Sequence, residues 1–364
     1  MSDAENCAAA EIRARQVALH PPRAYGEPLA QARARLSPED FQVDELLSFE
    51  PSDAGPHWLL RVEKREVNTR WVAAELARLG GVPPAEVGYA GLKDRHALTR
   101  QWFSVPAARR EAEFWRQVSA PQYQVLEVRA NQRKLRRGAL RGNRFRIRLQ
   151  APAWPQQALR QRLDALRAQG APNYFGVQRF GREGGNLRAA FDWAAHGAAP
   201  HGRAPREFAL SAARAALFNA LLAARVEQGS WSRFDAGDVA ILQGSNSHFA
   251  AEPGDATLEQ RLRALDVHPS GALWGRGELA TQGAARQLEQ RVAKEFGALA
   301  RLLESQGLTQ ERRALRIAVL NLDAKLEDAW LTLSFELARG QFATAVLREV
   351  CEPAEGGPLD AEGD

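Results

Sequence analysis

The most informative segment of the chain reads Gly88-Tyr89-Ala90-Gly91-Leu92-Lys93-Asp94-Arg95-His96-Ala97-Leu98-Thr99-Arg100-Gln101-Trp102-Phe103-Ser104-Val105. It places one carboxylate, Asp94, between two cations, Lys93 and Arg95, with strand-like apolar residues on both sides. Adjacent cations favour the charged form of an acid, and a loop between two strands can aim a side chain into a cleft. A bare Lys-Asp-Arg tripeptide is more often a solvated turn, because surface ion pairs are weak. The segment therefore predicts two strands around an Asp94 loop, whose role depends on the rest of the chain.

Alternating apolar residues predict further strands on either side of this loop. Asn68 and Thr69 are candidate caps for a helix with Val72 and Leu76 on one face, which ends at Gly80-Gly81. The strands expected in the first part of the chain span residues 41–46, 57–62, 87–90, 101–105 and 122–128.

The pattern changes near Gly170, after which Ala- and Leu-rich helical segments dominate to about residue 316. Strand character returns at 330–337, and one late strand must join an existing sheet to be stable. We therefore expect an α+β protein with a mixed, mainly antiparallel sheet. Residues 1–30 have little periodicity and are expected to form a loose arm. The expected domains are a β-rich one built from 1–168 and 317–364, and a helix-rich α/β one inserted at 169–316.

Composition limits the function classes. The chain has 364 residues, 45% of them hydrophobic and 26% charged, which is typical of a globular protein with room for two domains. Cys7 and Cys351 are the only cysteines and no His spacing suggests ligands, so we expect neither a disulfide nor a metal. The N-terminus lacks the apolar region of a signal peptide, and we expect no membrane span.

A strongly basic segment runs from residue 129 to 148 and contains no acidic residue. Such one-signed density is the electrostatic footprint of phosphate binding, whereas a merely solvated face usually mixes both signs. In its last part Phe145, Ile147 and Leu149 alternate with arginines, which predicts a strand with one apolar and one cationic face. The nine basic residues are Arg129, Arg133, Lys134, Arg136, Arg137, Arg141, Arg144, Arg146 and Arg148.

The Asp94 segment resembles the active-site segment of the TruD family of tRNA pseudouridine synthases, in which the aspartate is essential. Other segments resemble family motifs in the family's order, so the resemblance extends from about residue 37 to 350. Arg35 stands where the family usually has a lysine, six residues before the motif phenylalanine Phe41. The other matching segments are 38–45, 138–145, 173–187, 210–219 and 340–349.

The resemblance implies a pseudouridine-synthase-like fold and an isomerase that converts uridine 13 of tRNA, with the base flipped into a cleft between the two domains. It implies that Asp94 is the essential carboxylate and that the insert contacts RNA. tRNA is the expected partner, and we expect a cytoplasmic monomer with no cofactor, metal or obligate protein partner. The residues expected to bind the substrate base are Phe41, Asn143, Phe145 and Phe342. The residues expected to contact RNA are Lys93, Arg95, Arg133, Arg136, Arg137, Arg179 and Arg182.

The chemistry suits a lone carboxylate. Pseudouridine formation breaks the N1–C1′ bond, turns the uracil and joins C5 to C1′, without redox change or group transfer. Asp94 can add to C1′ as a nucleophile or remove a sugar proton as a base, and the sequence leaves both open. Among rival functions, a non-catalytic RNA-binding module would not explain the Asp94 segment. A methyltransferase should show a Gly-rich cofactor turn and a metal-dependent nuclease should show clustered carboxylates, and the sequence has neither near Asp94.

Overall fold

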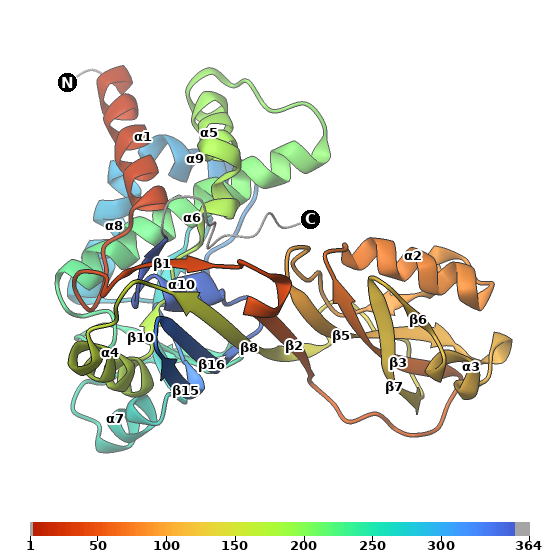
Figure 1. The fold of residues 1–364 in the computed structure, drawn as a ribbon. Helices are drawn as coiled ribbons and strands as arrows, with labels where there is room; N and C mark the ends of the chain where they lie inside the picture. Colours follow the sequence, from red (N-terminus) through yellow and green to blue (C-terminus); the bar gives the residue numbers. More distant parts are fainter. Residues whose placement is uncertain (1–2, 354–364) are drawn as a thin grey trace. The chain divides into compact units, whose positions relative to one another are not determined.

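The computed structural model describes residues 3–353, which form two compact units (Figure 1). The sheet unit comprises Leu29–Gln156, Val319–Ala343 and the segment from Cys351. The helical unit comprises the residues up to Pro28, Gln157–Ala318 and Thr344–Val350. The sheet unit is therefore built from an early and a late part of the chain, and its boundaries differ from the expected 1–168 and 317–364.

The boundaries differ because partly buried polar contacts connect distant segments within the helical unit. Arg162, on α4 (Gln156–Gln169), donates to the carbonyl oxygen of Tyr25 at 2.6 Å and to that of Glu349. The Tyr25 hydroxyl donates to the carbonyl oxygen of Gly170 at 2.6 Å. These contacts join residues more than 130 positions apart, so local sequence pattern does not reveal them.

The N-terminal segment is a helix, α1 (Asp3–Leu19), and not the loose arm that its composition suggested. Ala10, Ala14 and Ala18 recur at intervals of four and are buried in the core of the helical unit. Alanine gives a helix only a weak hydrophobic stripe, so its periodicity is easily missed. Small side chains nevertheless allow α1 to pack against α5 (Gly185–His196) and α6 (Arg203–Glu227).

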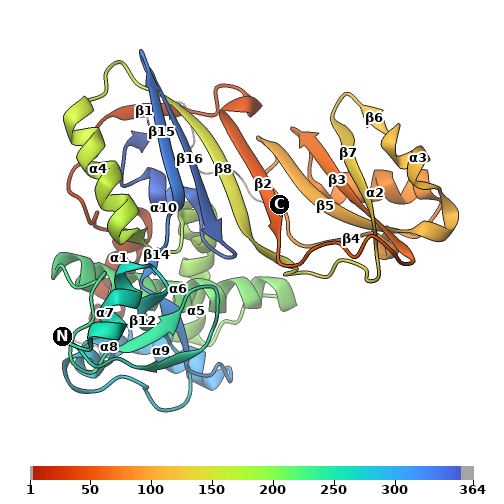
Figure 2. The ribbon, with the colours of Figure 1, turned by 90° about the horizontal axis from the view of Figure 1, so that it is seen from below.

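The sheet unit contains eleven strands among its described residues, in one mixed and mainly antiparallel sheet (Figure 2). Of the described pairs, β2 with β5 and β1 with β17 are parallel and the others are antiparallel. The late strand β16 pairs with β8 along its whole length, which confirms that it joins the sheet formed by the earlier strands. The main strand order is β15 (Leu320–Glu327), β16 (Trp330–Ala338), β8 (Leu140–Gln150), β2 (Phe41–Leu47), β5 (Leu98–Pro106), β3 (His57–Arg65), β7 (Tyr123–Asn131) and β6 (Ser119–Ala120). The remaining strands are β1 (Gln31–Ala34), β4 (Gly88–Tyr89) and β17 (Glu352–Pro353).

One face of this sheet is apolar, as the alternation in β8 predicts. Phe145, Ile147 and Leu149 are buried, whereas Arg144 and Arg146 point to the exposed face. At the β3–β5–β7 end the apolar face is covered by α2 (Thr69–Gly80) and α3 (Ala112–Arg116), which enclose a core of apolar side chains. Asn68 precedes α2 and Gly81 ends it in the left-handed conformation, in agreement with the sequence. The short 3₁₀ segments here are η1 (Pro38–Asp40), η2 (Pro84–Glu86) and η3 (Ala107–Arg109).

The helical unit packs its helices around a second core and carries a small sheet in the order β11-β10-β12-β13. A two-stranded pair, β9 (Ala171–Pro172) and β14 (Arg316–Ile317), lies where the chain enters and leaves the inserted part. Its other helices are α7 (Ala256–Arg263), α8 (Gly283–Glu295), α9 (Gly297–Ser305) and α10 (Ala343–Leu347), with 3₁₀ segments η4 (Val177–Phe180) and η5 (Arg182–Gly184). Its small-sheet strands are β10 (Val239–Leu242), β11 (His248–Ala250), β12 (Val267–Leu273) and β13 (Glu311–Ala314).

Helix α6 departs from the expectation that no segment could span a membrane. In the part of the chain that the structure describes, it is the one helix long and apolar enough to do so by length and composition. Its apolar window is 78% buried inside the protein, as it would be in the central helix of a globular unit.

A buried histidine gives the helical unit a predicted pH dependence. His268 Nδ1 accepts a hydrogen bond from Arg316 Nε at 2.8 Å, and Nε2 lies 2.7 Å from Gln243 Oε1. Desolvation and then the Arg316 charge lower the pKa of His268 from its ordinary 6.5 to about 3. At pH values between about 3 and 6.5, His268 is therefore protonated in the unfolded chain but neutral in the folded one. We expect the free energy of unfolding to fall as the pH drops from about 6.5 towards 3.

Urea titrations at about pH 7.5 and 4.5 measure this effect. The loss of stability on acidification should shrink in His268→Gln and persist in His248→Gln, which changes an exposed histidine of the same unit. An unchanged loss in His268→Gln would assign the acid sensitivity to other groups.

Candidate active site

Asp94 lies in the loop between β4 and β5, and its cationic partner is Arg35. Arg35 Nη2 donates to Asp94 Oδ2 at 3.2 Å, with 6% of the Arg35 side chain and 35% of the Asp94 side chain exposed. Arg35 Nη1 also donates to the carbonyl oxygen of His96 at 3.1 Å, and the guanidinium stacks 3.7 Å above the Phe41 ring centre. Arg35 itself has a φ of +59°, a left-handed conformation that is unusual for this residue type. One guanidinium thus fixes the carboxylate, the loop backbone and an aromatic ring.

The two cations beside Asp94 in sequence do not pair with its carboxylate, which corrects the prediction. The Lys93 ammonium is buried 2.6 Å from Glu45 Oε2, and Glu45 Oε1 accepts the backbone N–H of Trp102 at 3.2 Å. The sequence analysis expected Lys93 to contact RNA at the surface. Its burial beside Glu45 corrects that expectation. Arg95 is exposed, and its Nε donates to the carbonyl oxygen of Glu66 at 3.4 Å. Successive side chains of an extended loop point in different directions, so neighbours in sequence need not be neighbours in space.

The structure brings Phe41, Asn143 and Phe145 to the same face of the sheet. Phe41 is opposite Ile147 and Glu45 is opposite Asn143 in the β2–β8 register, so their side chains alternate onto one face. The Phe145 ring stacks on Phe335 at 5.5 Å and meets the Phe41 ring edge-on at 6.3 Å. Both Phe41 and Phe145 are at most 7% exposed, so each also serves as core packing.

The side-chain oxygen of Asn143 is an acceptor without a hydrogen-bond donor among the described residues. Its Oδ1 is buried and makes no hydrogen bond with any described residue. A buried acceptor without a donor costs free energy, so such an atom commonly marks a place where a ligand or water binds. The imide N–H of a uracil is a donor of the required kind.

Phe342 is not joined to this group. It follows β16, is 39% exposed, and has no ring contact with Phe41 or Phe145 in the described structure. Its role in substrate binding stays a prediction.

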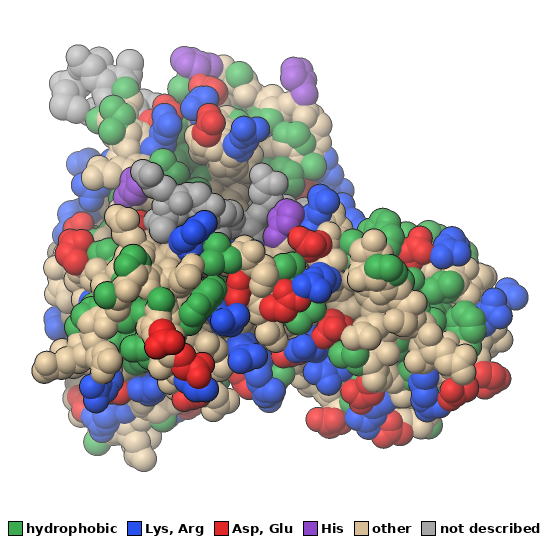
Figure 3. Space-filling model, viewed as in Figure 1, with side chains coloured by type: hydrophobic (Ala, Val, Ile, Leu, Met, Phe, Trp, Pro, Cys, Tyr) green, Lys and Arg blue, Asp and Glu red, His purple; other side chains and the backbone are tan. Residues whose placement is uncertain are grey.

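In the folded structure, acidic side chains from elsewhere in the chain pair with several arginines of the basic segment. Arg129 pairs with Asp53 at 2.7 Å, Arg144 with Glu336 at 2.8 Å and Arg148 with Asp40 at 3.1 Å. Figure 3 shows acidic and basic side chains intermingled on the visible surface of the sheet unit. Acids from distant parts of the chain therefore neutralise part of the predicted phosphate-binding segment.

Three exposed arginines of the basic segment, Arg133, Arg136 and Arg137, lie in the loop between β7 and β8. No ion pair joins any of the three to a carboxylate within residues 3–353. Arg137 instead donates to the Tyr89 hydroxyl at 2.8 Å and stacks on that ring at 4.1 Å. We call residues 132–139 the basic loop.

The basic loop is attached to the Asp94 segment by backbone contacts. Gly138 N donates to the carbonyl oxygen of Ala90 at 2.8 Å, and Leu135 N donates to Ser104 Oγ at 2.9 Å. Gly88 permits this close approach, because a Cβ there would lie 2.4 Å from the Leu135 carbonyl oxygen. The three arginines of the basic loop therefore border the loop that carries Asp94.

In the helical unit, the aromatic and arginine string at 173–187 is largely structural. Tyr174 and Phe180 are buried in its cores. Arg313 lies 4.1 Å above the Phe175 ring, and its Nη2 donates to Asn173 Oδ1 at 2.6 Å. The candidate RNA contacts, Arg179 and Arg182, both lie at the surface, where Arg179 donates to Ser211 Oγ at 2.8 Å. These two arginines stay candidates.

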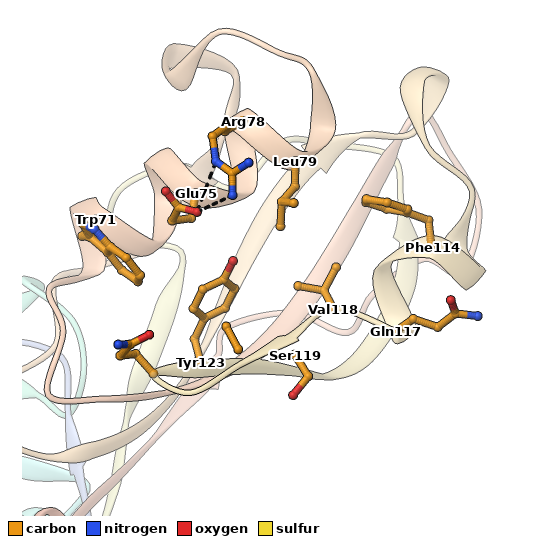
Figure 4. A pocket seen from close by; sticks show the side chains of 11 residues that line it. Trp71, Glu75, Arg78, Leu79, Phe114, Gln117, Val118, Ser119 and Tyr123 are labelled. Carbon is orange, nitrogen blue, oxygen red and sulfur yellow. Dashed lines mark hydrogen bonds and ion pairs between the residues drawn. The ribbon is translucent and has the colours of Figure 1, made fainter.

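A hollow of about 600 Å³ lies elsewhere on the sheet unit, between α2, α3 and the β6–β7 hairpin (Figure 4). Trp71, Tyr123 and Phe114 line it, and its charged groups Glu75 and Arg78 pair with each other at 2.7 Å. None of the residues that line it is a candidate site residue. Within residues 3–353, no three His, Cys, Asp or Glu side chains are grouped as metal ligands would be.

The chain matches a known protein family over most of its length. The model of the family tRNA pseudouridine synthase D (TruD) matches residues 24–189 and 205–350. A tRNA pseudouridine synthase D of Methylococcus capsulatus is 47% identical over 332 residues, covering 91% of this chain and 94% of the relative. A protein of the same name from Xanthomonas axonopodis is 45% identical over 357 residues, covering 94% and 97%.

The fold is also found among solved structures. A crystal structure described as a candidate tRNA pseudouridine synthase D from Methanosarcina mazei superposes with a TM-score of 0.74. It covers 93% of this chain and 97% of its own, at 20% sequence identity. The expected pseudouridine-synthase-like α+β fold is thereby confirmed.

Proposed function

Since the chain belongs to the TruD family of tRNA pseudouridine synthases, an isomerase family acting on tRNA, we propose that it converts uridine 13 of tRNA with Asp94 as the essential carboxylate. The observation that carries the role of Asp94 is its partly exposed carboxylate, held by the nearly buried Arg35. The guanidinium of Arg35 in turn stacks on Phe41, beside Phe145.

The site geometry supports specific roles for these groups. The target base must leave its stack to be reached. Asn143 Oδ1 lacks a protein donor and can accept the N3–H of the flipped uracil, while Phe41 and Phe145 provide aromatic surface beside it. Asp94 then either attacks C1′ as the N1–C1′ bond breaks, or removes a sugar proton. The base turns and C5 bonds to C1′, which releases Asp94 from C1′ in the first route and is followed by return of the proton to the sugar in the second. C5 then loses its proton and N1 gains one, so the product is an isomer of the substrate.

Conversion of tRNA transcripts tests the proposal directly. Pseudouridine formation should be detected at position 13 by mass-shift labelling, and a transcript with cytidine at that position should give no product. The alternative, a non-catalytic RNA-binding module, predicts tRNA binding without any labelled product. Product at another uridine would keep the enzyme class and correct the target.

We expect the basic loop to supply phosphate contacts. Each contact released contributes about 0.7–0.9 to the slope of log affinity against log salt. The triple change Arg133→Ala, Arg136→Ala and Arg137→Ala should therefore make that negative slope less steep by about 2. It should weaken tRNA binding most at low salt. Filter binding or fluorescence anisotropy over a salt series measures both quantities.

The matched control is Arg116→Ala on α3, where the exposed arginine is paired with Glu113 at 3.2 Å. It should leave the slope unchanged. An unaltered slope in the triple variant would make the basic loop an ordinary solvated surface.

The helical unit is proposed to bind RNA through Arg179 and Arg182 without contributing to the chemistry. The candidates for catalysis and base binding, Asp94, Asn143 and Phe145 among them, all belong to the sheet unit. We further propose that the enzyme acts in the cytoplasm as a monomer. The expected cleft between the two domains stays a prediction.

A further inference from the structure

A fully buried lysine lies beneath the Asp94 loop. Lys64, near the end of β3, is 0% exposed. Its Nζ donates to the carbonyl oxygens of Asp94 at 2.7 Å, Val67 at 2.8 Å and Lys93 at 3.3 Å. Lysine is rarely buried completely, so this ammonium needs an explanation beyond filling space.

Thr69, the first residue of α2, binds the same loop through a backbone N–H rather than through a carbonyl oxygen. Its Oγ1 accepts the backbone N–H of Lys93 at 3.0 Å and donates to Gln101 Oε1 at 2.8 Å. Gln101 Nε2 in turn donates to the carbonyl oxygen of Gly91 at 3.2 Å. Thr69 and Gln101 are both 0% exposed.

Together these contacts fix the backbone on both sides of the Asp94 Cα atom. Lys64 is paired in register with Thr99 and Tyr123 on the neighbouring strands, and Thr69 is held at the start of a helix. The ties therefore run from rigid elements to the loop, and those to Lys93 are buried, so they satisfy polar backbone groups that water does not reach. The direction of the Asp94 side chain depends on this backbone, because the Cα–Cβ bond follows it.

We propose that Lys64 and Thr69 are positioning residues for the isomerisation, which aim Asp94 at the sugar of the flipped nucleotide. The proposal rests on the proposed function of the site. Neither residue touches the substrate; each acts through the backbone of residues 93 and 94. Arg35 restrains the carboxylate of Asp94. Lys64 and Thr69 instead restrain the main chain from which the Asp94 side chain projects. Misplacing a reacting group by about 1 Å can cost about 100-fold in rate, which is why such ties matter.

The test compares matched substitutions at both positions. Thr69→Val removes the hydroxyl and keeps the shape, while Thr69→Ser keeps the hydroxyl. Lys64→Met removes the ammonium, and Lys325→Met makes the same change at an exposed position on β15. Single-turnover rate at saturating tRNA, the tRNA dissociation constant and the thermal unfolding midpoint are measured for each variant.

We expect Thr69→Val and Lys64→Met to lose about 100-fold in single-turnover rate. The tRNA dissociation constant should stay within about threefold of wild type, because phosphate contacts dominate affinity. Thr69→Ser should recover about tenfold or more of the loss seen in Thr69→Val, and Lys325→Met should behave as wild type.

Rates within about threefold of wild type in Thr69→Val, with a lowered unfolding midpoint, would overturn the inference, because the ties would then only stabilise the fold. If Lys64→Met does not fold, Thr69→Val decides the outcome, since it preserves the side-chain volume. Absence of conversion by the wild type would instead overturn the proposed function. Normal rates in these variants beside an inactive Asp94→Asn would overturn the positioning role alone.

Discussion

Replacement of Asp94 by asparagine should abolish conversion of tRNA while leaving the fold and tRNA binding nearly intact. The amide keeps the shape of the side chain but supplies neither a nucleophilic oxygen nor a base, and such groups account for about 100- to 10,000-fold in rate. We therefore expect the single-turnover rate at saturating tRNA to fall by at least about 1,000-fold. Affinity should hold, because it depends mainly on phosphate contacts and not on a carboxylate.

The matched control is Asp53→Asn, which changes an exposed carboxylate of the same unit that also pairs with an arginine, Arg129. It should retain the wild-type rate. Turnover by Asp94→Asn within about tenfold of wild type would remove Asp94 from the chemistry, and circular dichroism would verify that the variant is folded.

Removal of the Arg35 guanidinium should also cause a large loss of rate. Arg35→Met leaves Asp94 without its ion-pair partner, the His96 carbonyl oxygen without a donor and the Phe41 ring without its stacked cation. We expect a loss of about 100-fold in single-turnover rate with a much smaller change in tRNA affinity. Arg35→Lys should recover part of this loss, because an ammonium restores the charge but not the planar fork or the stack.

A matched pair at an exposed site controls for loss of an arginine. Arg78→Met and Arg78→Lys alter an arginine on α2 that pairs with Glu75 away from Asp94, and both should keep the wild-type rate. An Arg35→Met enzyme with an unchanged rate would show that Asp94 needs no cation. Equal rates for Arg35→Met and Arg35→Lys would assign the effect to packing on Phe41 and not to charge.

Local pattern in the sequence predicted most elements of the sheet unit. The alternation of Phe145, Ile147 and Leu149 with arginines gave the strand β8 and its two faces correctly. Asn68 and Gly81 marked the ends of α2, and the late alternating segment from residue 330 joined the sheet as β16. These features depend on residues close in sequence, whose periodicity determines which side chains share a face.

Prediction failed where contacts over long sequence separations decide the outcome. Among the described side chains of α1, the buried ones are Ala10, Ala14 and Ala18, whose weak apolar stripe gave no clear sign that the helix packs against α5 and α6. The acids that neutralise Arg129, Arg144 and Arg148 lie far away along the chain. A count of charges within one segment cannot include them.

The sequence by itself determined the α+β class, the strands around Asp94 and the identity of that carboxylate as the candidate for catalysis. Only the tertiary structure decided which cation lies beside it: Arg35 binds Asp94, while Lys93 turns inward to Glu45. Likewise, no sequence pattern indicated that Lys64 belongs near the site. In the structure it lies on the buried face of β3, and its ammonium donates to the Asp94 carbonyl oxygen. The physical reason is that periodicity sets the face on which a side chain lies, whereas strand register and loop conformation set the partner it meets.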